Sequence, residues 1–266
     1  MRIFTVDAFT NQAFKGNPAG VCVLDGPLNE KEYLNIAQEI NLPETAFTYP
    51  IPDGYSLRWF TPTEEVDLCG HATLATAKIL FEKFNYPEEE ICFDTLSGDL
   101  TVKNLGEKLE MNFPYRKMEL VIMDAVLENF LGETPIYVGA DRDWCMVEME
   151  TEEQIINFRP NLELLKKHPR KVFAITAKSK QKDYDFTSRV FGPAIGIDED
   201  PVTGSAHCYL AKYWSEKLGK KILKGFQASK RSGEIECELI DNQRILLRGD
   251  CVVMSEMLVK WDKEMV

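Results

Sequence analysis

Asp67-Leu68-Cys69-Gly70-His71-Ala72 returns in altered form later in the chain, as Asp200-Pro201-Val202-Thr203-Gly204-Ser205-Ala206. The two glycines are 134 residues apart (204 − 70), about half of the 266-residue chain. Each copy follows an Arg-x-Phe-x-Pro segment, at 58–62 and at 189–193, and each is followed by a Ser-Gly pair, at 97–98 and at 232–233. Matches in the same order at a nearly constant offset predict a duplicated chain. Each half is expected to present a glycine-containing turn before a helix.

The two glycine turns also suggest where a ligand binds. The first N–H groups of a helix have no partner within the helix, and the helix dipole places partial positive charge there. Gly70 and Gly204 would let a ligand approach the backbone closely, which favours binding of an anion. One such glycine is explained by a tight turn alone, whereas two with similar polar neighbours favour a site. We expect a small acid to be held between the two halves.

Composition and charge narrow the class of protein. The chain is 44% hydrophobic and 28% charged, as is usual for a globular protein, and its net charge is −12 without a long Lys/Arg run. These values argue against a nucleic-acid partner. The N-terminus does not resemble a signal peptide and no apolar run reaches the length of a membrane span, so we expect a cytoplasmic protein without membrane association. The seven cysteines are scattered and form no C-x-x-C pair, which predicts reduced thiols, no metal site and no cofactor.

Hydrophobic periodicity predicts an α+β fold with two pseudo-symmetric domains. Buried helices are expected from 70 to about 84 and from 204 to about 218, and an amphipathic helix with a capping box is expected from 29 to 40. Short strand-like runs surround each buried helix, so each half should be a mainly antiparallel, barrel-like sheet around one helix. The segment from 118 to 165 predicts two helices and two strands. The predicted domains are 1–115, which a C-terminal strand at 254–266 could complete, and 116–253.

The residues that differ between the copies are candidates for chemistry. His71 faces Ser205 in the alignment of the two copies, and Cys69 faces Thr203. Glu44 lies outside the repeat, at a helix-to-strand junction, where a carboxylate could act as general acid and base. Of the other histidines, His168 is expected on the solvated surface and His207 is ambiguous.

Several motifs carry a resemblance to a known family: Asp7-Ala8-Phe9-Thr10, Gly16-Asn17-Pro18-Ala19-Gly20-Val21, Asn41-x-x-Glu44-Thr45-Ala46-Phe47, the stretch at 67–72 and Glu199-Asp200-Pro201-Val202-Thr203-Gly204-Ser205-Ala206-His207. With them the chain resembles the PhzF-like (phenazine biosynthesis) family. The resemblance covers nearly the whole chain. It implies the diaminopimelate-epimerase-like fold, a cofactor-independent isomerase and a homodimer.

The resemblance also implies roles for single residues. Glu44 would move a proton between carbons of a cyclic, hydroxylated amino acid. His71 and Asp200 would orient and polarise this substrate, and Gly70 and Ser205 would supply polar contacts at the two turns. Pro43 departs from the family, whose members often carry Ser there, and this departure puts the substrate in doubt.

Two other readings stay open at this stage. Racemases and epimerases of the wider superfamily carry a cysteine before each glycine, whereas this chain has Cys69 and Thr203. A single-thiol epimerase or dehydratase using Cys69 with Thr203 is therefore one alternative. A catalytically silent protein that binds a small anion is the other.

Overall fold

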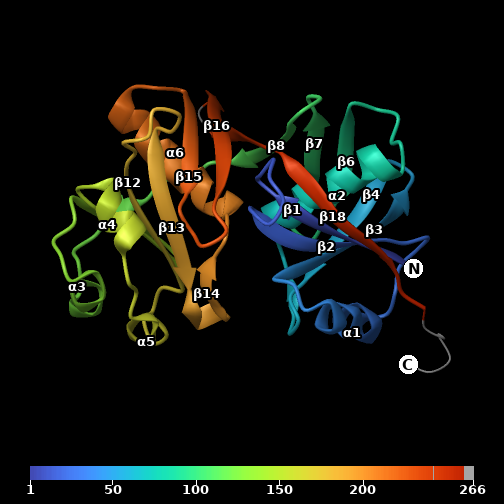
Figure 1. The fold of residues 1–266 in the computed structure, drawn as a ribbon, viewed down its shortest axis with the longest axis horizontal. Helices are drawn as coiled ribbons and strands as arrows, with labels where there is room; N and C mark the ends of the chain where they lie inside the picture. The colour runs from blue at the N-terminus through green and yellow to red at the C-terminus, as the bar shows by residue number, and fades with distance from the viewer. Residues whose placement is uncertain (242, 261–266) are drawn as a thin grey trace. The chain divides into compact units, whose positions relative to one another are not determined.

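The computed structural model describes residues 1–241 and 243–260, and these divide into two compact units (Figure 1). Unit 1 comprises Met1–Asn112 and the segment that starts at Arg248, and unit 2 comprises Phe113–Leu247. Within the described part of the chain, no helix has both the length and the apolar character needed to cross a membrane.

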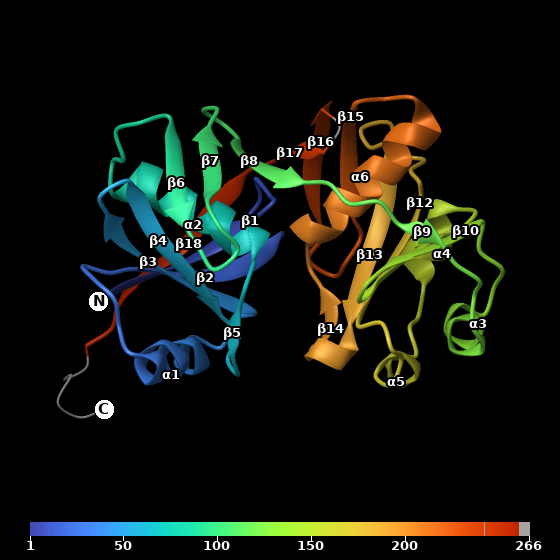
Figure 2. The same ribbon diagram turned by 180° about the vertical axis from the view of Figure 1, so that it is seen from behind.

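Unit 1 is a curved sheet with one helix at its centre (Figure 2). Helix α2 (Gly70–Lys83) contacts strands β1, β2, β3, β7 and β18, and almost all of its first eleven residues are buried. The sheet and its second helix comprise β1 (Arg2–Ala8), β2 (Asn17–Val23), α1 (Glu30–Ile40), β3 (Glu44–Ile51), β4 (Gly54–Phe60), β5 (Glu65–Val66), β6 (Glu90–Asp94), β7 (Leu100–Asn104), β8 (Leu109–Pro114) and β18 (Cys251–Leu258).

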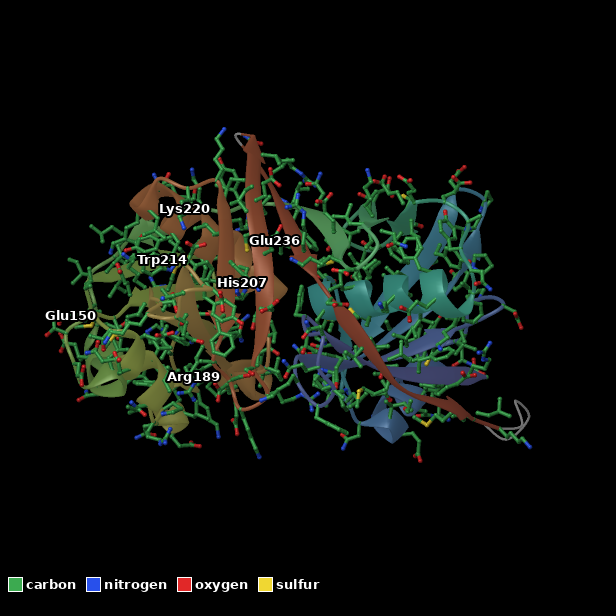
Figure 3. All side chains as sticks on the ribbon, turned by 45° about the horizontal axis from the view of Figure 1, so that its top comes forward. Glu150, Arg189, His207, Trp214, Lys220 and Glu236 are labelled. Atoms are coloured by element: carbon green, nitrogen blue, oxygen red, sulfur yellow. The ribbon has the colours of Figure 1, made fainter. Side chains whose placement is uncertain are left out.

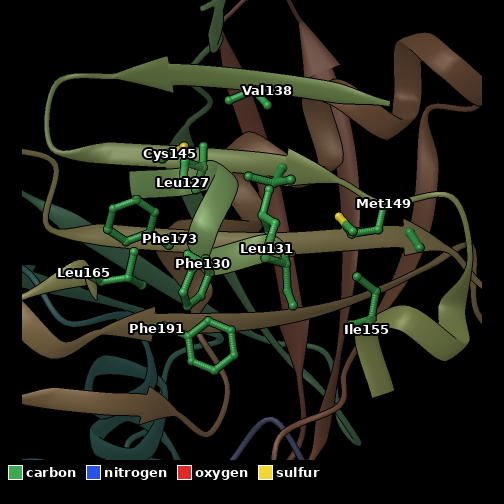
Figure 4. Packing of buried hydrophobic residues seen from close by; sticks show 13 residues of the cluster. Leu127, Phe130, Leu131, Val138, Cys145, Met149, Ile155, Leu165, Phe173 and Phe191 are labelled. Atoms are coloured by element: carbon green, nitrogen blue, oxygen red, sulfur yellow. The ribbon is translucent and has the colours of Figure 1, made fainter. Parts of the chain in front are cut away.

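Unit 2 has the same plan around helix α6 (Gly204–Leu218). Its elements are β9 (Glu119–Leu120), α3 (Ala125–Leu131), β10 (Tyr137–Asp141), β11 (Trp144–Glu148), α4 (Glu152–Asn157), α5 (Leu162–Leu165), β12 (Val172–Lys178), β13 (Phe186–Gly192), a 3-10 turn (Pro193–Ile195), β14 (Ile197–Asp200), β15 (Ile222–Gln227), β16 (Gly233–Asp241) and β17 (Arg244–Gly249). An aromatic core lies on the side of its sheet that α3, α4 and α5 cover, where Phe130, Phe173 and Phe191 pack together (Figure 4).

Strand pairing repeats between the units. In unit 1, β2 and β3 are parallel, β3 and β4 antiparallel, and β4 then pairs with β5 antiparallel and with β6 parallel. In unit 2, β11, β12, β13, β14 and β15 pair in the same order and with the same directions. The predicted α+β duplication is therefore confirmed, with two parallel pairs in each otherwise antiparallel sheet.

Local sequence explains where the three longer helices begin. Asn29 caps α1, because its side chain accepts the N–H of Glu32 while the Glu32 carboxylate accepts the N–H of Asn29. Helices α2 and α6 begin at Gly70 and Gly204, as predicted, and their N-cap residues Cys69 and Thr203 make no side-chain cap.

Two other predictions need correction or restriction. The segment 118–165 contains three helices and three strands instead of two of each, because the short elements β9 and α5 have too few residues to show a period. The predicted C-terminal strand 254–266 corresponds in part to β18, which pairs with β1, while residues 261–266 lie outside the described residues.

Candidate functional site

The first group of candidate residues lies in unit 1, where Glu44 meets His71. Helix α1 ends at Asn41, whose left-handed backbone (φ 52°) turns the chain, and Glu44 opens β3. Tyr33 of α1 stacks on Phe60 of β4 with ring centroids 5.0 Å apart, which holds this junction in place. His71 is the second residue of α2, and its Nε2 lies 3.2 Å from Oε2 of Glu44. Both side chains are buried, so water does not screen this contact.

The other nitrogen of the His71 ring has two polar neighbours. The Asn17 amide nitrogen lies 3.3 Å from Nδ1, and Sγ of Cys69 lies 3.4 Å from it. With the Asn17 amide donating to Nδ1, the ring carries its proton on Nε2 and points that proton at Glu44. The Asn17 residue opens β2 and was not predicted as a site residue. Its appearance in the quoted Gly16-Asn17-Pro18 motif is the signal that could have identified it.

The surroundings shift two pKa values in this group. Burial by itself lowers the pKa of His71, but its neighbours Cys69 and Glu44 raise it well above the usual value, and we attribute the rise to the adjacent Glu44 carboxylate. The expectation that the helix N-terminus keeps this histidine neutral is therefore wrong. Burial raises the pKa of the Cys69 thiol, so the sulfur stays protonated at neutral pH.

The second group lies in unit 2 and centres on Asp200 and Thr203. The Thr203 hydroxyl donates to Oδ2 of Asp200, at the end of β14. Gln227, fully buried at the end of β15, accepts the N–H of Thr203 at 2.9 Å. Its amide nitrogen donates to the Asp200 carbonyl at 2.8 Å and to the Thr203 hydroxyl oxygen at 3.1 Å. Gln227 thus fixes the turn before α6, and nothing in the sequence around it indicates this role.

The remaining residues of the second turn differ in exposure. Gly204 begins α6 and is buried, whereas the side chain of Ser205 is exposed. His207, labelled in Figure 3, is fully buried and its Nδ1 lies 2.8 Å from the Thr203 carbonyl. Burial lowers the pKa of His207 to about 4, so it is a neutral residue that supports the turn.

His168 is not on the surface, contrary to the prediction. Its side chain is buried, Nε2 lies 2.8 Å from the Asp124 carboxylate, and Nδ1 accepts the N–H of Arg170 at 3.0 Å. The Lys166-Lys167 pair before it suggested a solvated segment, but the ring instead packs edge-on against Phe173.

An arginine–glutamate pair recurs in both units as part of the scaffold. Arg58 binds Glu65 through two nitrogens, and Arg189 binds Glu199 in the same way. Each guanidinium lies 5.1 Å from the ring centroid of the phenylalanine two residues later in the chain. Arg189, labelled in Figure 3, is the more buried of the two and also donates to two main-chain carbonyls. Because both pairs are present, we assign them to the fold and not to the chemistry.

Strand register identifies the positions at which the two units differ. Arg58 lies opposite Phe47, three residues after Glu44, and Arg189 lies opposite Ile175. The position equivalent to Glu44 is therefore 172, which is a valine. In the same way Trp59 lies opposite Val66, whereas Val190 lies opposite Asp200. Each unit thus carries one buried or half-buried carboxylate for which the other unit has valine.

The comparisons with known proteins agree with this architecture. A family model described as phenazine biosynthesis-like protein matches residues 6–257. The chain belongs to this family. It is 48% identical over 262 residues to an uncharacterized isomerase of Halalkalibacterium halodurans, and the match covers 97% of this chain and 98% of that protein.

Solved structures place the fold as well. A crystal structure of a PhzF-family phenazine biosynthesis protein from Enterococcus faecalis superposes with a TM-score of 0.92 at 39% identity, covering 96% of this chain and 97% of that one. A probable proline racemase from Agrobacterium radiobacter K84 superposes with a TM-score of 0.65 at 11% identity over 98% of this chain and 93% of that one. The latter likeness shows the fold alone, and both fit the predicted epimerase-like class.

Within this family frame, the structure gathers the predicted residues into two groups, one in each unit. Glu44, Cys69 and His71 are brought together in unit 1, at the N-terminus of α2. Asp200 and Thr203 are brought together in unit 2, beside Gly204. The expectation that no cluster could hold a metal ion does not describe the first group. Its carboxylate, thiol and imidazole come from separate stretches of chain, so no spacing motif shows them.

Proposed function

We propose that this chain is an isomerase that moves a proton on a small, carboxylate-bearing, cyclic amino-acid-like substrate held by groups of both units, with Glu44 as the general acid and base. The observation that carries the proposal is the buried contact between Glu44 and His71. A carboxylate held at the start of a rigid strand by an imidazole donor is placed to act on a bound carbon acid.

The proposed reaction needs no oxidant and no second substrate. The Glu44 carboxylate removes a proton from a carbon of the substrate, and the electron pair of the broken C–H bond moves into the adjoining unsaturated system. The Glu44 carboxyl group then delivers the proton to a different carbon, which yields an isomer of the same composition. The Nε2–H of His71 orients the carboxylate through one oxygen and leaves the other for the substrate.

We assign substrate binding to the two turns. The first N–H groups of α2 and α6, at Gly70 and Ser205, would hold the substrate carboxylate. Asp200 would accept a hydrogen bond from the substrate amino group, while Thr203 and Gln227 hold that carboxylate in place.

The thiol alternative has less support. A single-thiol epimerase needs Cys69 as a thiolate, but burial raises the pKa of this thiol. It also needs Thr203 to hold a water or a substrate, whereas the Thr203 hydroxyl already donates to Asp200 and accepts from Gln227.

The test is the formation of an isomer by wild-type protein and by Glu44→Gln. Ligands recovered from the purified protein and a panel of cyclic hydroxylated amino acids are incubated with each in D2O and followed by NMR. Glu44→Gln should lose at least about 100-fold in turnover, as expected when the acid–base group is removed. Glu39→Gln, which changes an exposed carboxylate of α1, should keep the wild-type rate. A Glu44→Gln variant within about twofold of wild type would overturn the role of Glu44.

We further propose a homodimer, which rests on the family resemblance. Sedimentation velocity of the full chain tests it, and a monomer throughout the micromolar range would contradict it.

A further inference from the structure

Glu44, Cys69 and His71 form a group that can bind a metal ion. One carboxylate oxygen, the thiol sulfur and one ring nitrogen all lie within 4.8 Å of one another, and all three residues are buried. In the described part of the chain this is the group that combines such atoms at this spacing. Sulfur and imidazole nitrogen together are the ligands of Zn²⁺ and related thiophilic cations, and not those of Mg²⁺ or Ca²⁺.

The spacing fits a tetrahedral ion. Bond lengths of about 2.3 Å to sulfur and about 2.0 Å to nitrogen or oxygen give an N···O edge of about 3.3 Å and an S···N edge of about 3.6 Å. In this group Nε2 of His71 lies 3.2 Å from the Glu44 oxygen and 4.0 Å from Sγ of Cys69. Only the sulfur has to move, by a few tenths of an ångström.

We propose that Glu44, Cys69 and His71 bind Zn²⁺, or a thiophilic cation of the same class, as an inhibitor of the enzyme. Three protein ligands leave a fourth position for water or for a substrate group. A bound ion would occupy the carboxylate oxygen and the imidazole nitrogen that proton transfer requires. The inhibitory part of this proposal rests on the proposed function, whereas the binding part rests on the geometry alone.

Asn17 supplies an outer partner for the bound ion. When Nε2 of His71 binds a metal, Nδ1 carries the proton and needs an acceptor. The Asn17 amide already lies 3.3 Å from Nδ1, and a half-turn of that amide would present its oxygen in place of its nitrogen. Replacing such an outer partner typically weakens metal affinity by about 10–100-fold.

Binding is tested with Co²⁺, titrated into metal-free, full-length protein under reducing conditions. The visible bands of tetrahedral Co²⁺ and a near-ultraviolet thiolate-to-cobalt charge-transfer band should saturate together, and Zn²⁺ should displace both. Cys69→Ser should lose the charge-transfer band, and Asn17→Ala should keep it with an affinity lower by about tenfold or more. Cys92→Ser, at the more exposed cysteine of unit 1, is the matched control and should leave the spectrum unchanged.

The outcomes separate the two parts of the proposal. A wild-type protein without the charge-transfer band, or a Cys69→Ser protein of native circular dichroism that keeps it, overturns the metal site. Isomer formation that persists when Zn²⁺ saturates the site overturns inhibition. A cobalt spectrum as expected, together with no isomer formed from any compound tested without metal, supports the site and contradicts the proposed function instead.

Discussion

Replacing Glu44 by Gln removes the carboxylate next to His71 and should lower the pKa of that imidazole. The charges would lie 3.2 Å apart. At an effective dielectric constant of about 20 their attraction is about 5 kcal/mol, equivalent to about 4 pKa units. The amide oxygen of the substituted side chain would still accept a hydrogen bond from Nε2, and the site would relax, so we expect a decrease of about 1–3 units.

NMR titration measures this decrease directly, because the chain has only three histidines. The His207 signal, with a pKa of about 4, and the His168 signal serve as internal references and should not move. Glu39→Gln changes the net charge equally without touching the site and should leave the His71 pKa unchanged. A His71 pKa in Glu44→Gln that equals or exceeds the wild-type value would refute the assignment of the shift to Glu44.

The same pair makes stability depend on pH. The folded-state pKa of His71 is raised above its unfolded value, so its contribution is fully present below about pH 6.5 and is lost as the pH rises through the folded-state pKa. Urea unfolding of wild type and Glu44→Gln should therefore differ more at pH 6 than above the folded-state pKa. A difference that grows as the pH rises would contradict this sign.

Three further predictions concern the supports of the site. Gln227→Met leaves buried main-chain groups without partners and should cost about 2–4 kcal/mol in urea unfolding, whereas the exposed Gln38→Met should cost less than about 0.5. Arg189→Met should cost about 3–5 kcal/mol and Arg58→Met clearly less in the same assay, because Arg189 is more buried and also holds two carbonyls; equal losses would refute the ranking. Cys69 should react with iodoacetamide at least about 100-fold more slowly than a free thiol at neutral pH, as mass spectrometry of the peptide can show, and rapid labelling would revive the thiol mechanism.

Much of the fold could be predicted because it is encoded locally and encoded twice. The capping box at Asn29, the glycines that open α2 and α6, and the apolar runs that follow them are short-range patterns with one structural meaning each. The segment 118–165 lacked such patterns, since elements of two to four residues show no period.

The site was predictable only in part, for a different reason. Glu44, His71 and Asp200 could be identified from motif resemblance, but their contacts depend on which strands lie side by side. The Cys69–His71 contact and the position of Gln227 arise from pairing between segments far apart in the sequence. Exposure was misjudged for His168 in the same way, because Asp124 and Phe173, which cover it, come from other elements.

The valine at position 172 has a stereochemical consequence. A racemase with a proton carrier in each half works from both faces of its substrate and inverts the carbon between them. In this chain the second half has an alkyl side chain where the first has Glu44, so in the proposed reaction one carboxyl group both removes and returns the proton. The hydrogen must then leave and arrive on the same face of the substrate, and product formed from deuterated substrate should retain part of its label. With this carboxylate in one half only, the duplicated fold would move a hydrogen along one side of a molecule instead of inverting a centre.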